Sequence, residues 1–170
     1  MSDVDTVELR EWIDRHAIEQ LIYRYSDAVT RADWDQLDTV FTADAVWESP
    51  PLGRRYEGPG AIREFLAKGS SALEILIQTP HCPVIRLLGP QSAQATTTLH
   101  EFTRGVIANT SAYGESGSGL NFEQYGIYFD DIAKLDGDWK FTRRLFVPVY
   151  VGPDCVTGQV IGPRTSLLPP

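Results

Sequence analysis

The segment HAIEQLIYRYSDAVTRADWDQLDTVFTADAVW, residues 16–47, predicts a helix, a tight turn, a second short helix and the start of a strand. Its first helix is amphipathic, with charged side chains on one side and apolar side chains on the other. The apolar side is formed by Ile18, Leu21, Ile22, Tyr25, Ala28, Val29 and Ala32. Asp33 and Gln36 have the spacing of a capping box, in which the N-cap side chain and the side chain three residues later each bind the other residue's backbone N–H. A second helix is therefore expected from Trp34 to about Phe41. The apolar side needs a second layer to cover it.

Length and composition indicate one globular domain, residues 1–170, that needs no disulfide or metal to fold. The net charge of −8 argues against nucleic acid as a partner, because phosphate contacts need a basic surface. No apolar run is long enough for a membrane helix, and the acidic N-terminus lacks the features of a targeting peptide, so we expect a cytoplasmic protein. The sequence contains no phosphate-binding loop and no common metal-ligand pattern, so neither cofactor nor metal is predicted.

The rest of the chain predicts short strands at 45–48 and 54–57, a helix at 59–69, and then strands only. These later strands are expected at 75–79, 84–88, 93–108, 122–135 and 139–151. Residues 109–121 form a polar connection that we expect to act as a flap, and residues 152–170 form an extended tail that packs on the domain or on a neighbouring subunit. Helices first and a long antiparallel sheet afterwards is an α+β arrangement.

Three segments and one histidine carry a family resemblance. They are RYSDAVTRADWDQLDTVFTADAVWE (24–48), YEGPGAIREFLA (56–67), His81 and YGIYFDDIAKLDGDWKFTRR (125–144). In this order they resemble the SnoaL-like branch of the nuclear-transport-factor-2-like superfamily. The resemblance implies a cone-shaped α+β barrel, in which a strongly curved antiparallel sheet wraps round the N-terminal helices and encloses a mostly apolar cavity. The superfamily includes dehydratases, isomerases, polyketide cyclases, dehydrochlorinases, oxygenase β-subunits and binding proteins.

The resemblance assigns His81 as a cavity base, since a histidine at the matching strand position removes a proton in dehydratase-like and dehydrochlorinase-like members. Pro80 and Pro83 hold this segment extended, and an imidazole is suited to proton transfer near pH 7. The alternative is a strand histidine that is exposed or bonded to a backbone carbonyl. The aspartate that orients the base in the family is replaced here by Thr30, which can bind an imidazole but cannot neutralise it.

Either Tyr25 or Arg144 is predicted to stabilise an enolate-like oxyanion. Tyr25 lies on the buried side of the first helix, and its hydroxyl needs a partner. Arg144 matches a basic family position, and a structural ion pair is the alternative role for it. Polyketide cyclases of the family use a late-strand aspartate in the region of Asp130 and Asp131, but here the nearby turn suggests a solvated strand end.

The remaining ligand-binding candidates are aromatic or lie near His81. The predicted substrate-binding residues are Thr30, Phe41, Trp47, Tyr56, His100, Tyr128 and Phe146. Strand alternation places either His100 or Glu101 on the concave side, and both faces contain apolar members, so the choice stays open at this point.

These residues together predict cofactor-independent acid-base catalysis. The expected reaction is that of a lyase or an isomerase on a small hydrophobic substrate of the aromatic or polycyclic kind. Two alternatives are a hydrophobic-ligand-binding protein without catalysis and the structural β-subunit of a ring-hydroxylating oxygenase. We expect a homo-oligomer, dimer or trimer, with a small hydrophobic molecule as its ligand.

Overall fold

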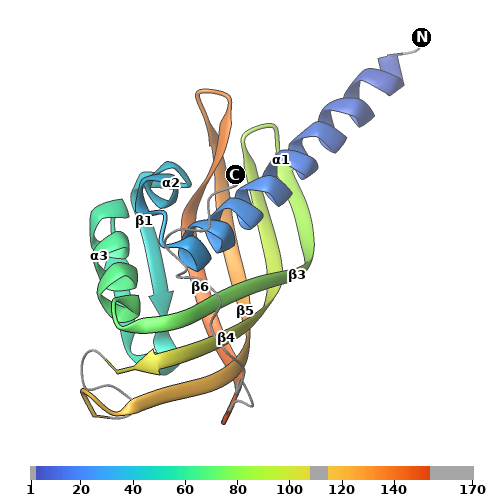
Figure 1. The fold of residues 1–170 in the computed structure, drawn as a ribbon. Coiled ribbons are helices and arrows are strands. Elements are labelled where there is room, and N and C mark those ends of the chain that lie inside the picture. The colour runs from blue at the N-terminus through green and yellow to red at the C-terminus, as the bar shows by residue number, and fades with distance from the viewer. Residues whose placement is uncertain (1–2, 108–114, 154–170) are drawn as a thin grey trace, which may run out of the picture.

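The computed structural model describes residues 3–107 and 115–153, in which three α-helices are set against one curved sheet (Figure 1). The elements in chain order are α1 (Asp3–Arg31), α2 (Trp34–Thr39), β1 (Phe41–Ser49), the 3-10 helix η1 (Pro50–Leu52), β2 (Arg54–Glu57), α3 (Pro59–Ser70), β3 (Leu73–Gly89), β4 (Ser92–Val106), β5 (Gly119–Leu135) and β6 (Asp138–Pro153). The first half of the predicted flap and residues 154–170 of the tail lie outside the described residues. The predicted α+β cone is confirmed.

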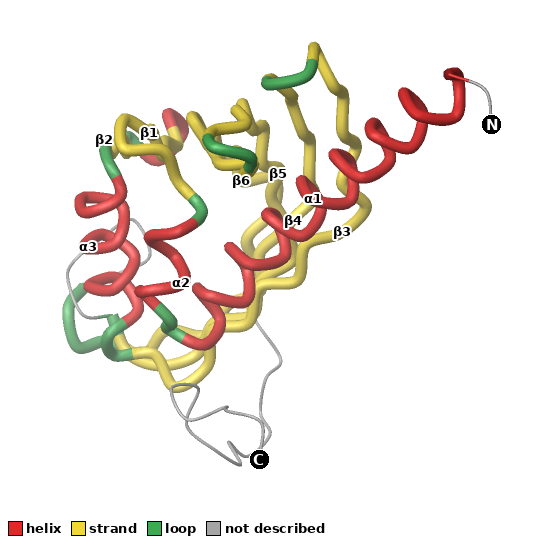
Figure 2. Tube along the Cα trace, turned by 90° about the horizontal axis from the view of Figure 1, so that it is seen from above, coloured by secondary structure: helices red, strands yellow, loops and turns green. Residues whose placement is uncertain are grey.

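Helix α1 lies across the hollow side of the sheet, and its first turns project beyond the strands (Figures 1 and 2). The predicted apolar side is buried from Ile18 to Val29, whereas Leu9 and Trp12 on the projecting part are exposed. The helix begins earlier than the sequence predicted, at Asp3, and it ends at Arg31, before Ala32, whose φ of 56° is left-handed. Among the described helices, none combines the length and the apolar character needed to cross a membrane.

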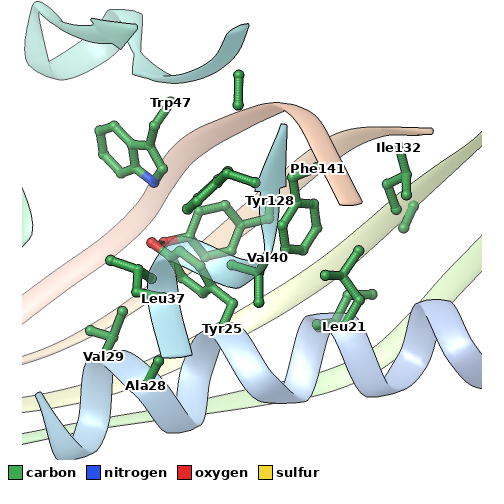
Figure 3. Packing of buried hydrophobic residues seen from close by; sticks show 14 of the residues in the cluster. Leu21, Tyr25, Ala28, Val29, Leu37, Val40, Trp47, Tyr128, Ile132 and Phe141 are labelled. Atoms are coloured by element: carbon green, nitrogen blue, oxygen red, sulfur yellow. Dashed lines mark hydrogen bonds between the residues drawn. The ribbon is translucent and has the colours of Figure 1, made fainter. Parts of the chain in front are cut away.

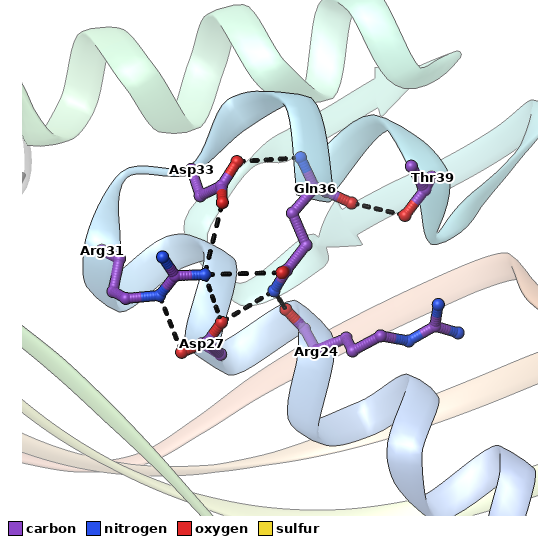
Figure 4. Close-up of polar contacts among 6 residues, drawn as sticks. All are labelled: Arg24, Asp27, Arg31, Asp33, Gln36 and Thr39. Atoms are coloured by element: carbon purple, nitrogen blue, oxygen red, sulfur yellow. Dashed lines mark hydrogen bonds and ion pairs between the residues drawn. The ribbon is translucent and has the colours of Figure 1, made fainter. Parts of the chain in front are cut away.

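The turn between α1 and α2 is fixed by polar contacts around Gln36 (Figure 4). The carboxylate of Asp33 accepts a hydrogen bond of 3.0 Å from the backbone N–H of Gln36, as predicted for an N-cap. The Gln36 side chain does not make the reciprocal hydrogen bond to the Asp33 backbone that a capping box requires. It donates instead to the backbone oxygen of Arg24 at 2.9 Å and to Asp27 at 2.8 Å, which joins the two helices.

The six strands form one sheet in the order β2-β1-β6-β5-β4-β3. The sequence predicted an antiparallel sheet, but β1 and β6 pair in parallel. The reason is topological: α3 carries the chain to the far edge of the sheet, and three hairpins then bring it back until β6 lies beside β1. Strand β3 lies at one edge of the sheet and is a single long strand, although two were predicted around Pro80 and Pro83. An edge strand tolerates proline because one row of its N–H groups has no ladder partner.

Gly126 in β5 lets an aromatic ring pack directly on the backbone. A Cβ atom at this position would lie 2.2 Å from Cε2 of Phe146, and the register of β5 against β6 shifts between Tyr125 and Gly126. We predict that Gly126→Ala lowers the free energy of unfolding by about 1–3 kcal/mol, the usual cost of overpacking, in urea titrations. Gly60→Ala is the matched control, because a Cβ there meets nothing within 4 Å, and it should not destabilise the protein. Equal effects of the two variants would contradict this account of Gly126.

Candidate functional site

A pocket of about 610 Å³ lies between the concave face of the sheet and helix α3. Its wall takes residues from α1, β1, β2, α3 and all of the remaining strands. Most lining side chains are apolar or aromatic, among them Trp47, Leu76, Leu99, Phe122 and Phe146. This size and character are typical of pockets that bind small molecules.

Aromatic rings form a continuous side of the pocket. Tyr56 and Phe65 stack with ring centroids 4.2 Å apart, and Trp47 lies 5.0 Å from Phe65. Phe146 continues the row, 6.4 Å from Trp47 and 5.0 Å from Tyr128. Four of these rings, those of Trp47, Tyr56, Tyr128 and Phe146, were among the predicted substrate-binding residues and line the pocket. Phe65 was not predicted.

Glu101 on β4 places a carboxylate in the pocket wall. Its Oε2 accepts a hydrogen bond of 2.7 Å from Nε2 of Gln78, and its Oε1 accepts from Nε2 of Gln124 at 2.6 Å and from the hydroxyl of Thr103 at 3.2 Å. The residue is only 6% exposed, and all four side chains line the pocket. Three neutral donors therefore fix the direction of a buried carboxylate at the ligand surface.

The choice between His100 and Glu101 is settled by the register of β4. Alternate residues Thr97, Leu99, Glu101 and Thr103 are buried on the concave side. His100 points to the outer face, where its Nε2 lies 2.7 Å from Oε1 of Glu123. The predicted substrate contact by His100 is therefore not present.

His81 also lies on the outer face and is exposed. It pairs with Thr98 across the β3/β4 ladder, and its ring centroid is 6.3 Å from that of His100. The expected placement in the cavity is wrong, because alternation along β3 turns Gln78 inward and His81 outward. A bulge follows at once, between His81 and Val84, where Cys82 has a φ of 46°.

Thr30 and Phe41 have structural contacts in place of the predicted ligand contacts. The Thr30 hydroxyl accepts a hydrogen bond of 3.0 Å from the backbone N–H of Gln78, which ties α1 to β3. Phe41 is 3% exposed and packs edge-on against Tyr25, with ring centroids 5.9 Å apart. Neither residue lines the pocket.

Arg144 and Asp130 form a fully buried ion pair beside the pocket. Nε of Arg144 lies 3.2 Å from Oδ1 of Asp130, and both side chains are 0% exposed. The guanidinium carbon is 4.0 Å from the ring centroid of Tyr25, 3.9 Å from that of Tyr128 and 4.3 Å from that of Phe141. Arg144 is thus a structural cation held by one carboxylate and three rings, and it does not line the pocket. Asp130 is not the solvated strand end that the sequence suggested.

The two phenols beside Arg144 stay protonated. Figure 3 shows Tyr25 and Tyr128 pointing toward one another, and their hydroxyl oxygens are 3.5 Å apart. Burial, the largest effect, raises the pKa of both hydroxyls, although the charge of Arg144 opposes it. Only Tyr128 lines the pocket, so Tyr25 acts through Tyr128 if it acts on a ligand.

Asp130 makes stability depend on pH. Burial, the largest effect, raises the pKa of Asp130 from 3.8 to about 7, although Arg144 opposes it. Because the folded protein then binds this proton more tightly than the unfolded chain, the contribution to stability is full below pH 3.8 and is lost as pH rises to 7. We predict that wild type loses roughly 2–3 kcal/mol of unfolding free energy between pH 5 and 8 relative to Asp130→Asn. Urea titrations at the two pH values test this, and parallel curves for the two proteins would contradict it.

The described residues contain no group of three or more His, Cys, Asp or Glu side chains arranged to hold a metal ion. The sequence singled out the aromatic part of the pocket but missed its polar part, Gln78, Thr103 and Gln124. One signal was available for Glu101: its own face of β4 carries Ala93, Ala95 and Leu99, whereas the other face is mostly polar.

Solved structures with the same fold include several proteins named for enzymes. A hexachlorocyclohexane dehydrochlorinase of Novosphingobium barchaimii is 16% identical, with a TM-score of 0.74 over 90% of this chain and 98% of that one. A candidate scytalone dehydratase from Novosphingobium aromaticivorans is 19% identical, with a TM-score of 0.71 over 86% and 91% of the two chains. A candidate aromatic ring hydroxylase from the same species is 22% identical, with a TM-score of 0.70 over 83% and 93%. At these identities the likeness establishes the fold alone.

The sequence itself matches a defined protein family. The profile of the SnoaL-like domain matches residues 10–145, which include most of α1, the other helices, the buried ion pair and every residue of the pocket wall except Phe146. The match spans most of the 170 residues. This chain therefore belongs to the SnoaL-like domain family.

Proposed function

We propose that this protein is a lyase or isomerase that moves a proton on a small, largely hydrophobic carbonyl compound, with Glu101 as the base. The observation that carries the proposal is the Glu101 carboxylate, which is buried, oriented by three donors and part of an aromatic pocket. The names of structural neighbours with the same fold, a dehydrochlorinase and a candidate dehydratase, agree with lyase chemistry.

The proposed reaction uses side chains alone. Glu101 takes a proton from the carbon next to the carbonyl, and the C–H electron pair passes through the new C=C bond to the carbonyl oxygen. The hydroxyl of Tyr128, which burial keeps protonated, donates a hydrogen bond to this oxyanion. The electron pair then returns. In a lyase reaction it expels a leaving group from the next carbon, and Glu101 gives its proton to that group. In an isomerase reaction of an unsaturated ketone, the far carbon of the conjugated dienolate takes the proton back from Glu101.

A ligand-binding protein without catalysis is the second candidate, and one observation favours it. The three hydrogen bonds that orient Glu101 also stabilise its charged form, and a carboxylate stabilised in this way is a weaker base. The two candidates make different predictions for the exchange of a ligand's protons with solvent.

The test uses 2-tetralone, an aromatic ketone of suitable size with acidic C–H bonds. Wild-type protein in D₂O should catalyse loss of the C1 proton signal in the NMR spectrum, with a rate that saturates as the ketone concentration increases. Calorimetry measures binding in the same buffer. Binding without catalysed exchange would overturn catalysis in favour of a binding protein, and the absence of both would overturn the proposed ligand class.

A further inference from the structure

The mouth of the pocket carries two cations, Arg54 on β2 and Lys68 in the last turn of α3. Arg54 is half-buried, and its guanidinium carbon lies 5.2 Å from the ring centroid of Phe65, another lining residue. Stacking on a ring leaves the N–H groups at the edge of a guanidinium able to bind a carboxylate with two parallel hydrogen bonds. The geometry therefore places a preorganised anion-binding group at the edge of an apolar pocket.

Other arginines near Arg54 are paired with carboxylates, but Arg54 is not. Arg55, its neighbour on β2, forms ion pairs of 2.7 Å with Glu48 and 3.0 Å with Glu57, and Arg63 on α3 contacts two aspartates. Within residues 3–107 and 115–153, no carboxylate lies within ion-pair distance of Arg54. Acidic residues outnumber basic ones by 23 to 15 in this chain, so carboxylate partners are plentiful. An arginine that lines the pocket without such a partner is therefore a candidate for binding an anionic ligand.

Lys68 reinforces the positive charge at the mouth. It is exposed and, like Arg54, has no carboxylate within ion-pair distance in the described parts of the chain. Glu64 also lines the pocket, one helical turn before Lys68, but it is exposed and forms no ion pair there with either cation. Two cations and one solvated carboxylate leave this end of the pocket positive.

Arg54 and Glu101 both line the pocket, but they stand on strands that are far apart in the sheet. β2 and β4 are four steps apart in the sheet order, which corresponds to roughly 19 Å along the sheet at about 4.8 Å per strand. The curvature of the sheet makes the direct path shorter. Trp47, Phe146 and Tyr128, on the intervening strands β1, β6 and β5, also line the pocket.

We propose that the ligand of this pocket is an aromatic or polycyclic carboxylic acid, and that Arg54 and Lys68 are the residues that select its carboxylate. The apolar body of the ligand lies along the aromatic wall and extends toward Glu101. The assignment rests on the proposed function only in placing the reacting carbon at the Glu101 end. Anion binding by Arg54 does not require that any chemistry follows.

The experiment compares two probes of nearly equal shape, 2-naphthylacetate and its neutral analogue 2-naphthylacetamide, by calorimetry at pH 7.5. Wild type should bind the acetate about tenfold more tightly or better, the gain expected for one charge-assisted pair. Arg54→Gln should remove this preference, so that the acetate and the acetamide bind about equally. Arg55→Gln, the matched control next to it, should keep the preference, and the exposed Lys68→Gln should reduce it in part.

Each outcome separates this inference from the proposed function. Equal binding of the two probes by wild type, or an unchanged preference in Arg54→Gln, overturns the carboxylate site even if 2-tetralone exchange is catalysed. Failure of both probes to bind also overturns it. A preference that depends on Arg54, found without any catalysed exchange, supports the carboxylate site and overturns only the catalytic proposal.

Discussion

Glu101→Gln should slow the exchange of 2-tetralone protons about a thousandfold, within the range typical for the loss of a general base, while the ketone still binds. Glutamine has the shape of glutamate but cannot accept a proton from carbon. The free energy of unfolding should be measured as well, because the new amide replaces an acceptor that holds Gln78 and Gln124. A folded variant that binds and does not exchange is the expected result.

The matched control for this variant is Glu123→Gln. Glu123 lies on β5, and its carboxylate contacts His100 on the outer face of the same sheet. Its replacement makes the same chemical change away from the pocket, so exchange should continue at the wild-type rate. Wild-type exchange in Glu101→Gln, or an equal loss in the two variants, would contradict the role of Glu101.

Arg144→Met should lower the free energy of unfolding at pH 8 by about 3–5 kcal/mol, because it leaves the buried carboxylate of Asp130 without its cation. Methionine fills much of the same space among the rings of Tyr25, Tyr128 and Phe141. The loss should be smaller at pH 5, where Asp130, with its pKa of about 7, is protonated. Urea titrations at the two pH values measure both effects.

The double variant Arg144→Met/Asp130→Asn separates the charge effect from packing. Asparagine removes the uncompensated charge at nearly constant shape, so much of the loss at pH 8 should be recovered. A loss below about 1 kcal/mol in the single variant, or no recovery in the double variant, would show that the pair is not the electrostatic unit described here.

Local signals in the sequence were enough to predict that the three helices exist and that most of the aromatic wall, although not Phe65, faces a cavity. The apolar side of α1 follows the helical period and is buried as predicted, and Asp33 caps α2. Trp47 and Phe146 are large apolar residues on strands of a sheet with one hollow face, so their position in the wall followed from the fold.

Local signals could not predict which face of the sheet each strand side chain occupies. Alternation gives two sets of side chains but not which set faces inward, and that choice depends on pairing with distant strands. His81 points outward because it pairs with Thr98, whose side chain is on the outer face. The bulge that follows His81 is not predicted by any local sequence pattern. The burial of Asp130 likewise depends on Arg144, which lies opposite it on the neighbouring strand.

The most direct test of the proposed chemistry compares His81→Gln with Glu101→Gln in the 2-tetralone exchange assay. The family resemblance places the base at His81, whereas the structure places His81 outside the pocket and Glu101 in its wall. We predict wild-type exchange for His81→Gln and an approximately thousandfold loss for Glu101→Gln. Loss of exchange in His81→Gln with exchange retained in Glu101→Gln would contradict the assignment.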